Sequence, residues 1–128
     1  MTPFYYFIIF IFYIILPESL QGKIHSTVLF LLGFNKLLTP FWNLNYMPCD
    51  AYDHFLITHS TIYYICNTIR ISTIEYSPKM NIFLFHHFFS ILGLLTFNLL
   101  KCDQFCILFL IWASLGGFFY HLSLLFNK

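Results

Sequence analysis

The stretch MNIFLFHHFFSILGLLTFNLL, from Met80 to Leu100, decides the fold class. It is long and apolar enough to cross a bilayer as a helix, which takes about 20 mostly apolar residues. Yet it carries two adjacent imidazoles, His86 and His87, well inside the apolar run. Because lipid offers no hydrogen-bond partners, a polar side chain at that depth is expected to face other parts of the protein or a cavity.

The composition of the whole chain also indicates lipid as the solvent. The 128 residues are 59% hydrophobic and 9% charged, whereas soluble domains carry about 25% charged residues. We therefore predict an all-α fold, a multi-pass transmembrane helical bundle of about five spans, which forms one domain over residues 1–128. The apolar blocks expected to span are Pro3 to Leu16, Ile24 to Leu38, Phe55 to Ile69, Met80 to Leu100 and Phe105 to Phe126.

The charged, cysteine and histidine residues exclude several classes of function. The six Lys and Arg are scattered and the net charge is +1, so no nucleic-acid surface is expected. The four cysteines form neither a zinc pattern nor a disulfide framework, and we interpret them as small packing residues. A haem held by two histidines from facing helices is compatible with the histidine count, but no motif selects a pair. The sequence predicts no metal and no cofactor.

Polar residues recur on particular faces of the expected spans. In the third block, helical spacing places His59, Tyr63 and Asn67 on one face. In the fourth block, His86 and Ser90 share a stripe, with His87 and Asn98 beside it. Such faces should point toward a shared interior. His25, His54 and His121 fall near span ends, where we expect them at the membrane–water interface.

These polar residues can be explained either by a functional site or by structural hydrogen bonds. Ser and Thr in a span usually bond their own helix backbone, so we assign them structural roles. An ionisable residue inside a span is by default a functional-site hypothesis. For His59, His86 and His87, a functional site and structural hydrogen bonding stay equally open.

The order of these features resembles the TLC family, named for the TRAM, LAG1 and CLN8 proteins. The features are KIHST at 23–27, Asp50 and Asp53 in the loop before a polar span, FLFHHFFS at 83–90 after Lys79, and WASLGGF at 112–118. The resemblance covers about residues 23–126, and its sharp element is the His-His pair. Members usually have more spans and a longer C-terminal part, so the resemblance implies a divergent, shortened or incomplete member.

The resemblance implies a multi-pass protein, mostly of the endoplasmic reticulum, that handles or senses lipids. The ceramide synthase branch, which transfers an acyl group from acyl-CoA to a sphingoid base, adds an HDxxD motif after its His-His. Here the residues after His87 contain Asp103 but no His-Asp. The non-synthase branch, which acts in membrane lipid homeostasis, is therefore the better match.

These arguments predict a membrane protein of lipid homeostasis, lipid binding or lipid sensing rather than an enzyme, with membrane lipids as partners. Asp50 and Asp53 would line one mouth of a central cavity, and His86 and His87 would lie inside it. Two alternatives stay open: an N-acyltransferase of ceramide synthase type with a histidine as general base, and a non-catalytic structural subunit. The cavity or lipid-binding candidates are His86, His87, Asp50, Asp53, His59, Ser90 and Asn98.

Overall fold

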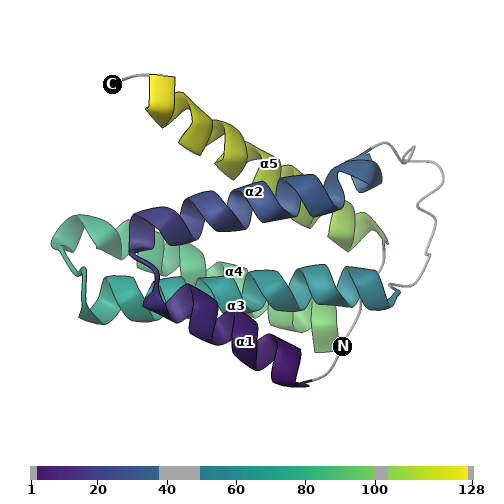
Figure 1. Cartoon of the computed structure of the whole chain (residues 1–128), viewed down its shortest axis with the longest axis horizontal. Helices are drawn as coiled ribbons and strands as arrows, with labels where there is room; N and C mark the ends of the chain where they lie inside the picture. The colour runs from purple at the N-terminus through teal and green to yellow at the C-terminus, as the bar shows by residue number, and fades with distance from the viewer. Residues whose placement is uncertain (1–2, 38–49, 100–103, 127–128) are drawn as a thin grey trace.

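Five α-helices make up the part of the chain that the computed structural model describes, residues 3–37, 50–99 and 104–126, some side chains within these ranges excepted. The all-α prediction is confirmed for these residues, and each predicted apolar block corresponds to one helix (Figure 1). The helices are α1 (Pro3–Ile15), α2 (Glu18–Leu37), α3 (Ala51–Thr73), α4 (Asn81–Leu99) and α5 (Gln104–Phe126), and a 3-10 turn, η2 (Pro78–Met80), precedes α4.

Helix α2 begins six residues earlier than its apolar block, at Glu18 rather than Ile24. The segment from Glu18 to Lys23 looked like a polar break because it contains Glu, Ser, Gln and Lys. In the fold, Gln21 is fully buried and its amide is satisfied inside the bundle. Its Nε2 donates to the carbonyl of Tyr13 at 2.6 Å, and its Oε1 accepts from Nδ2 of Asn67 at 2.8 Å.

Helix α3 likewise continues past Arg70, which the sequence indicated as its end. The guanidinium of Arg70 reaches the last turn of α1, where Nε and Nη2 donate to the carbonyls of Ile14 (3.2 Å) and Ile15 (3.1 Å). The final carbonyls of a helix have no partner within it. Arg70 therefore caps α1 from a neighbouring helix.

The helices pack in pairs around α2 and α3. Helix α5 lies along α2, α4 lies along α3, α1 lies against α3, and α2 also contacts α3. Among the described residues, helices α4 and α5 make almost no contact with each other, and the C-terminal part of α5 points away from the other helices (Figure 1).

Small residues allow α2 and α5 to approach closely. A Cβ atom added to Gly33 would overlap Cδ1 of Ile111, and one added to Gly117 would lie 2.9 Å from Oγ of Ser26. Close approach through small residues is typical of helices packed in membranes.

Several polar side chains are buried beside a hydrophobic core, and many large apolar side chains are exposed on the outside of the bundle. Outward-facing apolar residues such as Phe126 (80%) and Leu99 (75%) are strongly exposed. The buried polar or charged side chains are Gln21, His25, Ser26, Asp53, His59, Ser60, Thr61, Asn67 and His87.

Among the described residues, one helical stretch, Pro78–Thr96, is long and apolar enough by length and composition to cross a membrane. Helix α1 is apolar but shorter. The prediction of about five spans thus stays a prediction, although the five helices themselves are present.

Candidate functional site

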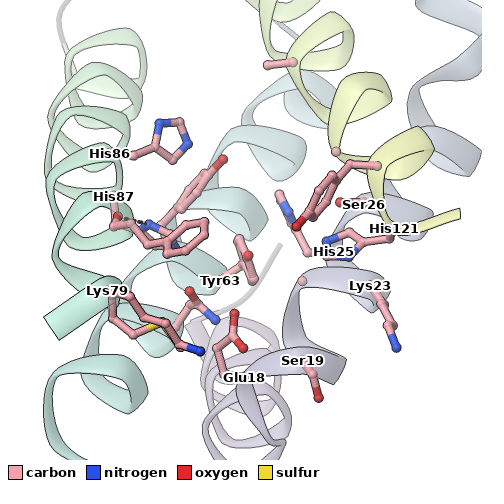
Figure 2. A pocket seen from close by; sticks show the side chains of 18 residues that line it. Glu18, Ser19, Lys23, His25, Ser26, Tyr63, Lys79, His86, His87 and His121 are labelled. Atoms are coloured by element: carbon pink, nitrogen blue, oxygen red, sulfur yellow. Dashed lines mark hydrogen bonds between the residues drawn. The ribbon is translucent and has the colours of Figure 1, made fainter. Parts of the chain in front are cut away.

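A cavity of about 680 Å³ lies between α2, α3, α4 and α5, at the end of the bundle where α2 and α4 begin. Its volume is within the range of about 300–1,000 Å³ that is usual for small-molecule sites. Aromatic and aliphatic side chains share its walls with imidazoles, amines and one carboxylate (Figure 2). The lining includes His25, Ser26, Tyr63, Tyr64, Asn67, Phe83, His86, His87, Gly117 and His121.

His87 projects from α4 into this cavity (Figure 2). Its side chain is only 5% exposed. Its Nδ1 is hydrogen-bonded to the carbonyl of Phe83, one turn earlier in the same helix. Its Nε2 is buried and has no hydrogen-bond partner among the described residues. Because a buried polar atom without a partner is costly, Nε2 of His87 is an atom of this site at which a ligand would be stabilising.

The wall formed by α2 and α3 holds His25 in a fixed orientation. Nε2 of His25 lies 3.0 Å from Oγ of Ser60, and its ring stacks on Tyr63 with a centroid distance of 4.0 Å and an angle of 6°. These contacts fix both the ring plane and one ring nitrogen. His25 therefore shapes the cavity wall rather than offering a free group.

His121 closes the side of the cavity formed by α5. Its ring fits against α2 because residue 22 is glycine: a Cβ atom there would lie 3.0 Å from Nε2 of His121. Its Nδ1 is buried without a partner among the described residues. His121 thus offers a second ring nitrogen beside the cavity.

The rim of the cavity is charged. Glu18, Ser19, Lys23 and Lys79 lie along one edge (Figure 2), near the ion pair between Arg70 and Glu75, whose Nη1 and Oε2 are 3.6 Å apart. Burial, and then the negative charge of Glu75, raise the pKa of the Glu18 carboxyl above its usual value. A charged rim over an aromatic interior suits an amphipathic ligand.

The structure brings His86 and His87 to the same cavity but gives them different environments. His86 is exposed, and its Nε2 lies 3.5 Å from Oγ of Ser90. Ser90 also donates to the carbonyl of His86 at 2.9 Å, the bond to its own helix that the sequence predicted for serines in spans. The deeper member of the pair is His87.

His59 lies away from the cavity, between α1 and α3. Its Nε2 is 2.7 Å from the hydroxyl of the fully buried Tyr13. It does not line the cavity, so its contacts favour a structural role in holding α1 on α3.

Asp50 and Asp53 are also separate from the cavity. They form a capping box at the start of α3, in which Asp50 Oδ1 accepts from the backbone N–H of Asp53 at 2.8 Å and Asp53 Oδ2 accepts from that of Asp50 at 3.1 Å. The cavity contacts α3 at Tyr63, Tyr64 and Asn67, about 15 Å further along the helix at 1.5 Å per residue. The side chain of Asn98 is outside the described residues.

Two cavity residues, His25 and His121, were expected at the membrane interface because they fall near span ends. The structure places both on the cavity wall, and His25 is 4% exposed. A sequence signal was present: Gly22 and Ser26 on α2, like Gly117 and His121 on α5, are four residues apart. Such spacing on facing helices indicates a close antiparallel contact.

The described residues contain no group of three or more His, Cys, Asp or Glu side chains that could hold a metal ion. Comparison with known proteins gives no match to any family model, curated protein or solved structure.

Proposed function

We propose that the protein is a multi-pass integral membrane protein that holds a membrane lipid in the cavity between α2, α3, α4 and α5. The observation that carries the proposal is this amphipathic cavity, lined by His87, whose buried Nε2 has no partner among the described residues, inside a bundle that exposes many large apolar side chains. Membrane lipid is the amphipathic molecule most abundant around such a surface.

The distribution of side chains supports the membrane part of the proposal. Along α4, Phe85 and Phe88 are exposed and point away from the packed interior, whereas His87 between them is buried. Water would make this arrangement costly at about 25 cal/mol per Å² of exposed apolar surface, whereas lipid tails remove that cost. A continuous apolar exterior of this kind marks a membrane or partner interface.

The site supports lipid binding or sensing rather than a specified reaction. We propose a role in membrane lipid homeostasis on this basis, and the TLC resemblance and an endoplasmic reticulum location stay predictions. The acyltransferase alternative requires turnover of an acyl donor, and the structural-subunit alternative requires an empty cavity.

The proposal is tested by measuring which lipids co-purify with the protein. Wild type, His87→Phe and Thr96→Val are extracted in mild detergent and their retained lipids are compared by mass spectrometry. Thr96 is a matched control because it lies on α4, is exposed and, among the described residues, bonds the carbonyl of Leu92 alone, at 2.8 Å. A lipid enriched in wild type and Thr96→Val but lost in His87→Phe supports the proposal. Wild-type protein without enriched lipid contradicts it and favours the structural subunit.

A further inference from the structure

We infer that the lipid held in the cavity is an alcohol whose hydroxyl group donates a hydrogen bond to Nε2 of His87. The inference rests on the proposed function and specifies the chemistry of the ligand. It follows from the hydrogen bonding of the His87 ring, from the position of its unpartnered nitrogen and from the charges at the rim.

The contact with Phe83 fixes the proton on the His87 ring. A carbonyl oxygen only accepts hydrogen bonds, so Nδ1 of His87 must be the donor toward Phe83. In the neutral imidazole the other nitrogen, Nε2, then carries a lone pair and no proton. Nε2 of His87 is therefore a hydrogen-bond acceptor.

No side chain described in the structure donates to this acceptor. The rings nearest to His87 are those of Tyr64, His86 and Tyr63, at centroid distances of 5.1, 5.7 and 6.4 Å. They contact its ring without a hydrogen bond to Nε2, which is buried and unpartnered. A ligand that completes the site has to bring an O–H or N–H donor.

The requirement for a donor separates the classes of lipid headgroup. An ionised phosphate diester or a carboxylate offers only acceptor oxygens, so it would leave Nε2 unpaired. An ammonium group is also a donor, but Lys23 and Lys79 at the rim would repel it, and among the described residues Glu18 alone lines the cavity with a carboxylate that would attract it. An uncharged hydroxyl satisfies Nε2 without this repulsion.

The arrangement of the helices gives the lipid chain a place. The cavity lies between α4 and α5, which make almost no contact with each other in the described part of the chain, and both helices expose large apolar side chains. A hydroxyl at His87 would place the attached hydrocarbon chain between α4 and α5.

The test uses slender probes that differ only at the oxygen, compared at about pH 9, where the phosphate monoester is fully ionised and has no O–H donor: oleyl alcohol, its methyl ether and oleyl phosphate. Each competes for the wild-type protein in nanodiscs against a fluorescent analogue of oleyl alcohol. We expect the alcohol to bind about tenfold more tightly than the ether, which corresponds to about 1.4 kcal/mol, and oleyl phosphate to bind more weakly than the alcohol. The ratio of the affinities for the alcohol and the ether should fall to about one in His87→Phe and stay unchanged in Thr96→Val.

The outcomes separate this inference from the proposed function. Equal binding of alcohol and ether to wild type, or tightest binding of oleyl phosphate, overturns the hydroxyl assignment while leaving a lipid in the cavity. Absence of binding by all three probes overturns the hydroxyl assignment, and the proposed function falls with it only if wild-type protein also retains no lipid on purification. The wild-type comparison of alcohol with ether stands even if His87→Phe fails to fold.

Discussion

The buried amides of Gln21 and Asn67 should stabilise the bundle as a coupled pair. Gln21 joins α1 to α3: its Nε2 donates to Tyr13 at 2.6 Å and its Oε1 accepts from Asn67 at 2.8 Å. Both side chains are almost completely buried. Replacing either one alone leaves a polar atom of the other without its partner, so the cost includes that atom's desolvation.

The expected loss of stability follows from the hydrogen bonds that each substitution breaks. Gln21→Met and Asn67→Leu should each lower the free energy of unfolding by roughly 1–3 kcal/mol, because each leaves a buried amide group unpaired. The double variant should lose about 1 kcal/mol less than the sum of the two. The carbonyl of Tyr13 is not orphaned, because it also accepts from the N–H of Leu16 at 3.1 Å.

The assay is reversible unfolding in mixed micelles, followed by circular dichroism, for wild type, both single variants and the double variant. Thr68→Val is the control and should change stability little, since the hydrogen bond that the described structure gives Thr68 is to the carbonyl of Tyr64 in its own helix, at 2.6 Å. Additivity of the two single effects within about 0.5 kcal/mol would refute the coupling and with it the contact between Gln21 on α2 and Asn67 on α3.

Other changes test the packing and the charged rim. Gly33→Ala should destabilise the protein by about 1 kcal/mol or more, because the new Cβ overlaps Ile111, and Ile111→Ala should relieve that loss in a double-variant unfolding experiment. Arg70→Ala should expose α1 to proteolysis sooner than Arg70→Lys, because the lysine keeps one donor for the α1 carbonyls. The raised pKa of Glu18 means that the folded state holds its proton to higher pH than the unfolded chain. The free energy of unfolding should therefore fall as pH rises from the ordinary carboxyl range through that pKa, and Glu18→Gln should remove this fall in a pH series.

The apolar blocks of the sequence predicted the helices well, because the apolar character of a helix is visible in its local composition. The fourth and fifth apolar blocks agree with α4 and α5 to within a residue at each end. The start of α2 was missed because the amide of Gln21 forms its hydrogen bonds with α1 and α3. Such partners from distant parts of the chain cannot be seen in a local sequence pattern.

The cavity could be predicted only in part. The His-His pair marked α4, but nothing in the pair itself distinguished the buried His87 from the exposed His86. Asp50 and Asp53 were expected at the cavity because both are acidic and precede a polar span, whereas their spacing of three also fits a capping box, which is what they form. His25 and His121 required knowledge of which helices face each other, a tertiary property that only the glycine spacing hinted at.

The measurement that tests the account most directly is the mass of the wild-type protein released intact from a bilayer, compared with Ala113→Trp. Ala113 lines the cavity, so the tryptophan fills space there without removing a polar group. A single lipid adduct on wild type that is absent from a folded Ala113→Trp variant is the predicted result. Lipid adducts that are identical in the two proteins, or absent from both, would contradict a lipid held in the cavity.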